Sequence, residues 1–401
     1  MKKYLALTMA ACMALSLAAC GSSASSTTSS SAAASTEATS DSAATAEATG
    51  SDNITGIAQC CDVGTLDDES FNQGCWEAVK GYGDENGIEY NYYLPSGEDA
   101  SDEDRETLIR QAVADGANTI VCVGYLYGPA LAWAATEYPD VHFIAVDVNG
   151  FDINSEDGTI PENVFCVTFK EEEAGYLAGY AAVKDGFTKL GFLGGMAVPA
   201  VIRYGYGFVQ GANAAAKELG ATVEMKYIYT NTFSPDASIT AAMDTWYADG
   251  TQVVFACGGG IYVSIAEAAK KANAKIVGVD VDQAPIIDAL ANEDTTITSA
   301  MKGLASSTKA ALKGIIEDGK WDELAGKIDN LGLVSGTDMD ANYVGIPTGD
   351  GTAWCDTFTT DDYAALVAAM FDGTITVSND ITKKPADFAT DITLTDLGTL
   401  N

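Results

Sequence analysis

The sequence predicts an α/β protein of two lobes, each built on a doubly wound parallel sheet with flanking helices. Short apolar runs rich in Val, Ile, Phe and Tyr recur at intervals of roughly 25 to 35 residues. Most of these runs are continuously apolar, which is typical of parallel strands buried on both faces. Helical patterns separate the runs, so strand and helix alternate as in βαβ units. The runs fall into two sets, and two sets predict two lobes.

The predicted strands come in two series. The first series is Ile54–Cys61, Ile88–Leu94, Thr119–Gly124, Phe143–Val148 and Val164–Phe169. The second series is Leu190–Gly194, Thr222–Tyr229, Val253–Cys257, Ile276–Val279 and Thr296–Ala300. The helices predicted between them include Phe71–Glu85, Asp102–Ala114, Glu172–Ala182 and Ala237–Tyr247. We assign residues 53–168 plus 302–320 to an N-terminal lobe, and residues 169–301 plus 321–401 to a C-terminal lobe. Ligands of open α/β sheets bind beyond the carboxyl ends of the strands, so we expect the site in a cleft between the lobes.

The first 19 residues have the order of a secretory signal peptide. Lys2 and Lys3 precede an apolar run, Tyr4–Ala19, that is too short to span a bilayer as a helix. The run ends in Leu-Ala-Ala-Cys, which resembles a bacterial lipobox and implies cleavage before Cys20 and lipid attachment to its thiol. The alternative is an ordinary signal peptide followed by a chance cysteine. Residues 20–52 then form a disordered tether of mostly Ser, Thr and Ala. We therefore predict a protein held by lipid on the extracytoplasmic face of the cell membrane.

The charge of the chain limits its partners. It carries 57 acidic and 21 basic residues, a formal net charge of −36 at pH 7. Such a surface repels phosphate backbones, which argues against nucleic-acid binding. It also disfavours phosphorylated ligands and attachment to anionic lipid through basic patches. The simplest interpretation of the charge is solubility at a cell surface.

The cysteines and the single histidine limit the chemistry. Seven cysteines lie beyond Cys20, and an odd number cannot all pair within the chain: Cys60, Cys61, Cys75, Cys122, Cys166, Cys257 and Cys355. We interpret most of them as buried free thiols, because four lie in apolar strand-like runs. The only histidine, His142, begins a predicted strand, which excludes a His-based triad or a multi-His metal site. The sequence has no zinc-site spacing and no dinucleotide-binding glycine motif in register. We therefore predict neither a metal nor a cofactor.

The stretch Asp62–Gln73 follows the first predicted strand and is the richest in candidate ligand-binding side chains. Ser70 and Gln73 have the spacing of a capping box, which predicts that Ser70 caps a helix. Free N–H groups of its first turn would then point into the cleft. Phe71 can stack on a planar ligand, and Asn72 can offer a donor and an acceptor together. Alternatively, Phe71 is a core residue and the acids form a solvated loop.

The same stretch, Asp-Asp-Glu-Ser-Phe-Asn-Gln followed by Trp76, resembles the start of the basic membrane protein family. These bacterial lipoproteins include purine-nucleoside receptors that feed ABC importers. Further motifs agree in order between Ile54 and Lys302: Tyr138-Pro139-Asp140 with Phe143 and Asp147, Glu173–Tyr180, Gly191–Met196, Arg203–Phe208, Gly278–Gln283 and Thr298–Lys302. The resemblance implies a periplasmic-binding-protein-like fold of type I. It also implies a nucleoside ligand, with purines favoured, and an ABC permease and ATPase as partners.

Where the motifs match, the resemblance implies roles for residues around the base. Phe71 and Tyr204 would sandwich the base, although the family usually has Phe at the position of Tyr204. Stacking of a base on an aromatic ring is worth about 1–3 kcal/mol. Asn72 would hydrogen-bond the base, and Asp62 would line the wall of the N-terminal lobe.

The resemblance also implies roles around the sugar. Asp280 would grip the ribose hydroxyls through strong, charge-assisted hydrogen bonds. Lys302 would reach the same hydroxyls or pair with Asp280. Gly258 and Gly259, with Gly260, would let the backbone approach the sugar. From spacing alone, Asp280 and Lys302 also fit a structural ion pair, and the glycines also fit a strand-to-helix turn.

One departure from the family pattern concerns the base. After residues 123–125 the family commonly has a serine and an aspartate that address the base, whereas this chain continues Leu-Tyr-Gly-Pro. Pro129 supplies neither a carboxylate nor an N–H group. Purine recognition is therefore in question, and another nucleoside or another small polar molecule stays open as the ligand.

Two other functions are alternatives to binding for import. Residues 61–68 partly resemble the aspartate-rich calcium loop of nucleoside hydrolases, but Cys60 stands where the first Asp belongs and one extra residue precedes Asp67. Calcium needs about six to eight oxygen ligands, so we predict a binding protein and not an enzyme. A cell-surface sensor that passes its ligand to a signalling partner would use the same cleft and stays open.

Overall fold

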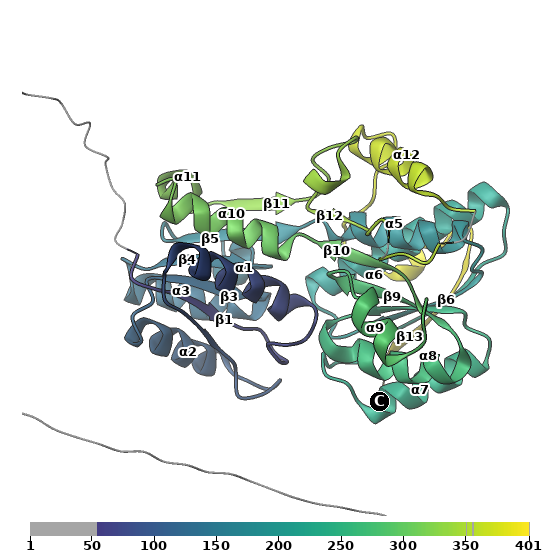
Figure 1. The fold of residues 1–401 in the computed structure, drawn as a ribbon, viewed down its shortest axis with the longest axis horizontal. Helices are drawn as coiled ribbons and strands as arrows, with labels where there is room; N and C mark the ends of the chain where they lie inside the picture. Colours follow the sequence, from purple (N-terminus) through teal and green to yellow (C-terminus); the bar gives the residue numbers. More distant parts are fainter. Residues whose placement is uncertain (1–53, 350, 355–356, 401) are drawn as a thin grey trace, which may run out of the picture. The chain divides into compact units, whose positions relative to one another are not determined.

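The computed structural model describes residues 54–349, 351–354 and 357–400. The predicted signal peptide, Cys20, the tether and Cys355 lie outside the described residues. The described part contains two sheets, and Figure 1 shows helices packed around each of them. None of the helices in this part of the chain is both long enough and apolar enough to cross a membrane.

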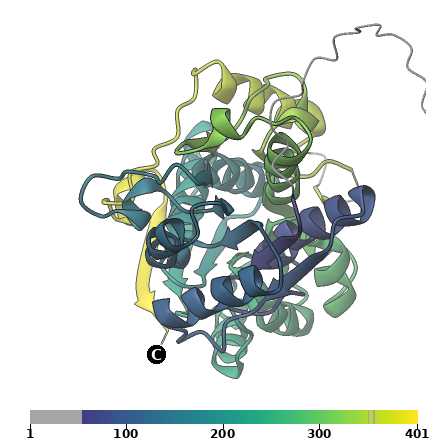
Figure 2. The ribbon, with the colours of Figure 1, turned by 90° about the vertical axis from the view of Figure 1, so that its left-hand side faces the viewer.

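The first sheet has six parallel strands in the order β11-β5-β4-β3-β1-β2. Their bounds are β1 Ile57–Cys60, β2 Tyr90–Tyr93, β3 Thr119–Val123, β4 His142–Val146, β5 Val164–Phe169 and β11 Ile328–Leu331. Its helices, which face the viewer in Figure 2, are α1 Phe71–Asn86, α2 Asp102–Ala114, α3 Gly128–Glu137, α4 Gly150–Ile153, α10 Leu304–Ile316 and α11 Trp321–Leu324. Side chains of α1 and α10 pack on one face and those of α2 and α3 on the other, so β1, β3 and β4 are buried throughout.

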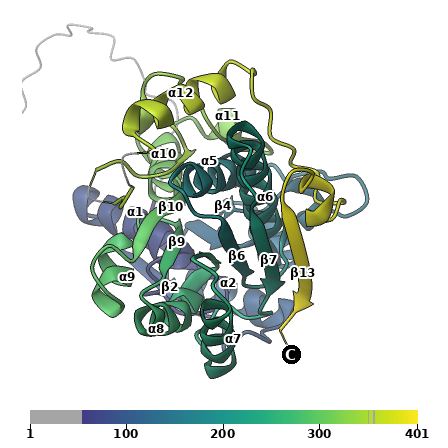
Figure 3. The ribbon, with the colours of Figure 1, turned by 90° about the vertical axis from the view of Figure 1, so that its right-hand side faces the viewer.

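The second sheet has seven strands in the order β12-β10-β9-β8-β6-β7-β13, all parallel except the antiparallel pair of β10 and β12. Their bounds are β6 Lys189–Gly194, β7 Glu224–Tyr229, β8 Val253–Cys257, β9 Lys275–Asp280, β10 Thr296–Lys302, β12 Val344–Gly345 and β13 Thr393–Thr399. Its helices are α5 Glu171–Lys184, α6 Pro199–Leu219, α7 Ala237–Ala248, α8 Tyr262–Ala272, α9 Ala284–Leu290 and α12 Thr360–Phe371. Figure 3 shows α5 and α6 over the strands, with β13 at the edge of the sheet.

The ten predicted strands are all present, with ends that differ from the prediction by a few residues. The prediction missed β11, β12 and β13. These are edge strands, and β11 and β13 are largely exposed, so they lack the apolar run that marks a buried strand. Because β11 pairs with β5, it belongs to the first sheet, whereas the predicted boundary placed residues from 321 onward in the C-terminal lobe.

The chain passes between the two sheets at three places: after β5, after β10 and after β11. After the first crossing, α5 packs closely against α6. A Cβ at Gly175 would lie 2.2 Å from the carbonyl oxygen of Tyr204, and a Cβ at Gly207 would lie 2.2 Å from that of Glu172. Only glycine fits such a close helix crossing. The crossing fixes Arg203 and Tyr204, at the start of α6, against the start of α5.

Candidate functional site

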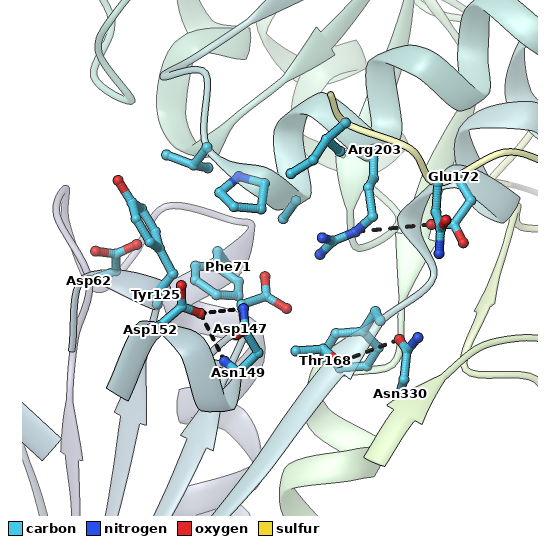
Figure 4. Close-up of a pocket in the computed structure, with 17 residues that line it drawn as sticks. Asp62, Phe71, Tyr125, Asp147, Asn149, Asp152, Thr168, Glu172, Arg203 and Asn330 are labelled. Carbon is cyan, nitrogen blue, oxygen red and sulfur yellow. Dashed lines mark hydrogen bonds and ion pairs between the residues drawn. The ribbon is translucent and has the colours of Figure 1, made fainter. Parts of the chain in front are cut away.

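Two adjoining cavities lie where the carboxyl ends of both sheets meet. The inner cavity has a volume of about 60 Å³ and the outer cavity about 230 Å³. Asp62, Phe71 and Asp147 line both cavities, so the two share a wall. In Figure 4 these three side chains approach the outer cavity from one side, and Arg203 approaches it from α6 on the other. The site therefore lies where the rule for open α/β sheets places it.

The inner cavity brings together the residues that the sequence predicted to bind ligand, with the exception of Gly260, which does not line it. Its lining includes Asp62, Phe71, Asn72, Tyr204, Gly258, Gly259, Asp280 and Lys302. Phe71 begins α1 beside the first sheet and Tyr204 lies on α6 beside the second, yet both side chains face the same space. Which of these residues contact a ligand stays a prediction.

The first turn of α1 is capped by Asp68 and not by Ser70. Asp68 Oδ1 accepts the backbone N–H groups of Ser70 (2.9 Å) and Gln73 (3.1 Å), and Asp68 Oδ2 accepts that of Asn72 (3.0 Å). The Ser70 hydroxyl instead donates to Asp280 Oδ2 at 2.7 Å. The predicted capping box is therefore wrong. A buried aspartate two positions earlier satisfies the N–H groups of the first turn, so these groups do not point free into the cleft.

Replacing Asp68 with alanine is expected to lower the free energy of unfolding by about 1–2 kcal/mol, as loss of a helix cap does. Three backbone N–H groups at the start of α1, those of Ser70, Asn72 and Gln73, would lose their acceptor, and Phe71 would lose its fixed place in the cavity wall. Urea denaturation at pH 7 measures the change. Asp67→Ala is the matched control, because the neighbouring Asp67 is exposed. Equal stabilities of the two variants would contradict the assignment of Asp68 as the cap.

The Asn72 side chain, which is 1% exposed, holds the loop that follows β1. Asn72 Oδ1 accepts the backbone N–H of Asp62 at 2.9 Å. Asn72 Nδ2 donates to the carbonyl oxygens of Val63 (3.3 Å) and Thr65 (3.2 Å). Both ends of the amide are thus engaged within the loop. A base would reach this side chain only by replacing one of these bonds, so the clearest role of Asn72 in the structure is to position Asp62.

Lys302 is the centre of a buried ion network. Its Nζ lies 2.5 Å from Asp147 Oδ2, 3.5 Å from Glu171 Oε1 and 3.7 Å from Asp280 Oδ1. The sequence-based pairing with Asp280 is therefore present, but Asp147 is the nearer partner. Asp147 follows β4 of the first sheet, whereas Lys302 ends β10 of the second, so this ion pair joins the two lobes.

Two aspartates of this network have an uncommon backbone conformation. Asp147 and Asp280 follow or end their strands with φ angles of 57° and 66°. Residues other than glycine are uncommon at positive φ, although aspartate tolerates it better than most. Backbone strain of this kind gathers at functional sites. Here it turns both carboxylates from the ends of β4 and β9 toward Lys302.

Arg203 and Glu171 extend the network toward the outer cavity. Arg203 Nε lies 2.6 Å from Glu171 Oε2 and 4.0 Å from Glu172 Oε2. Burial by itself would raise the pKa of Glu171, but Arg203 and Lys302 together hold that pKa below its ordinary value. Glu171 is therefore ionised and links the two cations of the site.

Burial raises the pKa of four further acids of the site toward neutral pH. Burial raises the pKa of Asp62 and of Asp147 to about 6. Burial likewise raises the pKa of Asp68 and of Glu172 to about 7. Each of these carboxyls is removed from water, and the cations and N–H groups nearby only partly compensate for the lost solvation. Such shifted acids are typical of functional sites.

Gly258 and Gly259 make room for an aromatic side chain that the sequence prediction did not include. Cβ atoms at these positions would lie 2.9 Å and 3.1 Å from atoms of Phe233, and the two φ angles are 151° and 46°. Phe233 lines the inner cavity together with these two glycines. The glycines thus permit close packing of Phe233, in addition to the turn after β8 that they also form.

The outer cavity contains several residues that the sequence prediction missed. Its lining adds Tyr125, Asn149, Asp152, Glu172, Arg203, Asn379 and Ile381, among others. Arg203 begins the quoted motif Arg203–Phe208, and Asp152 lies shortly after the quoted Asp147, so these motifs could have indicated both residues. Asn379 and Ile381 belong to the segment after α12, and no sequence signal pointed to it. Pro129 is exposed and lines neither cavity, whereas Tyr125 of the same loop does line one.

The family of the chain follows from a match to a family model. The model described as ABC transporter substrate-binding protein PnrA-like (Bmp) matches residues 57–341. The chain belongs to this family. As a Bmp member it is an ABC transporter substrate-binding protein, as the motifs had indicated. The matched residues include every residue of the inner cavity, whereas Asn379 and Ile381 of the outer cavity lie beyond the match.

Two relatives illustrate the Bmp family. The ABC transporter nucleoside-binding protein BmpA of Lactococcus lactis subsp. cremoris is 31% identical over 238 residues, which cover 55% of this chain and 62% of that protein. The chain thus spans less than two thirds of that relative. Basic membrane protein B of Borreliella burgdorferi is 31% identical over 282 residues, which cover 68% of this chain and 77% of that protein.

Solved structures agree on the fold. An ABC transporter solute-binding protein from Aeropyrum pernix K1 superimposes with a TM-score of 0.62 at 21% identity, covering 83% of this chain and 90% of that one. A second, from Conexibacter woesei, gives 0.59 at 24% identity, covering 81% and 99%. At these identities the likeness concerns the fold alone. It confirms the predicted α/β architecture of two parallel sheets with flanking helices.

Proposed function

We propose that this Bmp protein binds a nucleoside between its two lobes and delivers it to an ABC permease and its ATPase. One observation carries the proposal. Two aromatic rings from opposite lobes, Phe71 and Tyr204, face one cavity together with the Asp280 carboxylate and the Lys302 ammonium group. An aromatic pair suits a flat base, and a carboxylate suits the adjacent hydroxyls of a sugar. The name of the Lactococcus relative, a nucleoside-binding protein, supports the same ligand class.

The polar side chains favour a base that carries N–H donors, as purines with amino groups do. Asp62 Oδ1 and Asp147 Oδ1 are buried and accept no hydrogen bond from the described residues. Both carboxylates face the outer cavity. A buried acceptor without a partner costs free energy that a donor on the ligand would recover. Asp62 therefore supplies the carboxylate acceptor for the base that Pro129 cannot supply, and a purine nucleoside remains the favoured ligand.

We also propose that Cys20 carries lipid and that the tether holds the binding domain at the extracytoplasmic face of the cell membrane. The support is the signal-like order of residues 1–20 and the name basic membrane protein of the Borreliella relative. Metabolic labelling with a radioactive fatty acid tests this directly. Label should enter the wild-type chain and be lost in Cys20→Ser. Label retained by that variant would contradict lipidation at Cys20.

The site binds its ligand without transforming it. Asp68 is the acid that a calcium-dependent hydrolase loop would need, and both of its oxygens accept backbone N–H groups of α1. This carboxylate is thus committed to the helix. Incubation of the protein with inosine, followed by chromatography, should return intact nucleoside. Release of free hypoxanthine would establish catalysis instead.

Calorimetric titration with adenosine, guanosine, inosine, cytidine and uridine tests the ligand class. We expect binding of at least one purine nucleoside, with a negative heat-capacity change from burial of the base. Absence of binding for all five would reject the nucleoside proposal and leave the fold and family unchanged.

Asp280→Asn is expected to weaken nucleoside binding by roughly 1–3 kcal/mol, because a charge-assisted bond to the sugar becomes a neutral one. Asp280 also accepts the hydroxyls of Ser70 (2.7 Å) and Tyr204 (3.4 Å), so the isosteric change preserves its surroundings better than alanine would. Asp282→Asn is the control, since Asp282 lines neither the inner nor the outer cavity. Equal nucleoside affinities of the two variants would show that Asp280 does not bind the ligand.

A further inference from the structure

One carboxylate of the first lobe is bound by three donors of the second lobe, away from the Lys302 network. Glu98 lies in the loop between β2 and α2. Its Oε1 accepts the hydroxyls of Thr232 (2.7 Å) and Ser234 (2.8 Å) and the backbone N–H of Phe233 (3.3 Å). These three residues are the middle of the connection between β7 and α7, and we call them the 232–234 loop. Three donors that converge on one carboxyl oxygen make a strong and directional contact.

The middle residue of this loop forms part of the ligand cavity. The Phe233 side chain lines the inner cavity and packs on the glycines at 195 and 258, where Cβ atoms would lie 2.4 Å and 2.9 Å from its ring. The backbone of Phe233 is held from both sides. Its carbonyl oxygen accepts the N–H of Gly260 from its own lobe at 2.8 Å, and its N–H donates to Glu98 from the other lobe.

We infer that Glu98 is a positioning residue for ligand binding: it clasps the 232–234 loop when the lobes meet and thereby fixes Phe233 against the ligand. The inference rests on the proposed function for the identity of the ligand, but not for the contact itself. Glu98 lines neither cavity, so it acts only through the loop. Contacts that form only when two lobes close stabilise the closed state and slow ligand release.

Amide hydrogen exchange, measured without added nucleoside, tests the contact. In Glu98→Ala the Phe233 N–H loses its acceptor, and we expect its exchange to be at least about ten-fold faster than in the wild type. Asp99→Asn is the matched control, because it removes a negative charge from the exposed neighbouring residue. Exchange at Phe233 that is the same in Glu98→Ala as in the wild type would overturn the inference.

Stopped-flow measurement of nucleoside release tests the coupling to the ligand. We expect the dissociation rate to rise about ten-fold in Glu98→Ala, with a smaller change in the association rate. Glu98→Gln, which keeps a neutral acceptor, should restore part of the effect. Ser234→Ala should add little to Glu98→Ala, because the Ser234 hydroxyl acts through Glu98. Unchanged dissociation in Glu98→Ala, or fully additive effects of the two alanine substitutions, would overturn the role in ligand retention.

The two measurements separate this inference from the proposed function. If no nucleoside binds the wild-type protein, the proposed ligand is wrong, and the exchange comparison at Phe233 still decides whether Glu98 clasps the loop. If nucleosides bind and exchange at Phe233 is unaffected by Glu98→Ala, the proposed function stands and the clasp is wrong.

Discussion

Replacing Lys302 with methionine is expected to lower the free energy of unfolding by about 3–5 kcal/mol at pH 7.5, the usual cost of removing one partner from a buried ion network. The Lys302 side chain is 3% exposed, and carboxylates of Asp147, Glu171 and Asp280 surround it. Although burial acts to lower the pKa of Lys302, these carboxylates raise it above its ordinary value. Its ammonium group is therefore charged at neutral pH and its stabilising effect is fully present there.

Opening of the lobes would not relieve this loss. Separation exposes Asp147, which belongs to the first lobe, but Glu171 and Asp280 lie in the same lobe as Lys302. Both would keep a buried charge with less compensation. Without Lys302 the pKa of Glu171 should rise, and its protonation can relieve part of the cost, so the deficit of the variant should shrink as the pH falls from 7.5 to 5.

Chemical denaturation of wild type and Lys302→Met at both pH values measures the effect. Lys309→Met is the matched control, because Lys309 pairs with Glu85 at 2.7 Å while both side chains are about half exposed. Exposed pairs of this kind contribute little, so this variant should retain nearly all of the stability. A Lys302→Met protein as stable as the control would mean that the buried carboxylates need no cation.

Stability of the wild-type protein is expected to fall as the pH rises from about 5 to about 8. Burial raises the pKa of Asp62 and Asp147 to about 6, and of Asp68 and Glu172 to about 7. In the unfolded chain the same groups titrate near 4. Between these values the folded protein binds more protons than the unfolded chain, so the free energy of unfolding decreases with rising pH.

The size of this effect follows from the shifts. One pKa unit corresponds to about 1.4 kcal/mol, so between pH 5 and pH 8 each group with a pKa of about 6 contributes about 1.4 kcal/mol and each group with a pKa of about 7 contributes about 3 kcal/mol. The groups interact, and their sum is therefore smaller than four independent contributions. We expect a total loss of several kcal/mol across this range. Urea denaturation at pH 5, 6, 7 and 8 measures it, together with proton uptake or release on unfolding.

Two comparisons assign the pH effect to the site. The net charge of −36 also destabilises the fold at higher pH, but salt at about 0.5 M screens exposed charges and leaves buried groups largely unaffected. Most of the pH dependence should therefore persist in high salt. Asp62→Asn should flatten the curve around pH 5 to 6, since it removes one titrating group. A wild-type stability that is level or rises from pH 5 to 8 would contradict the shifted acids.

Much of the fold was predictable because burial leaves a direct mark on the sequence. A strand covered on both faces must be apolar throughout, and β1, β3, β4 and β8 are buried along their whole length. Edge strands such as β11 and β13 have a solvent-facing side and carry no such mark. Their places in the sheets come from pairing with β5 and β7, which local sequence does not encode.

Part of the cavity lining was also predictable, because parallel strands bring their carboxyl ends to one edge. Asp62 and Asp280 end or follow strands, and this rule together with the family motifs placed both in the cleft. The side chains' hydrogen-bond partners were not predictable. Ser70 has the spacing of a helix cap, yet its hydroxyl donates to Asp280, and Asp68 caps the helix instead.

The sequence by itself therefore determined the fold class, ten of the strands and eight of the residues that line the inner cavity. Only the tertiary structure decided that Asp147 is the nearest partner of Lys302, that Glu98 clasps the 232–234 loop and that Ile381 reaches the outer cavity. The physical reason is the separation along the chain of the residues that interact. Burial and strand direction act on each segment through its own composition, whereas these contacts join segments far apart in the chain and depend on how the lobes meet.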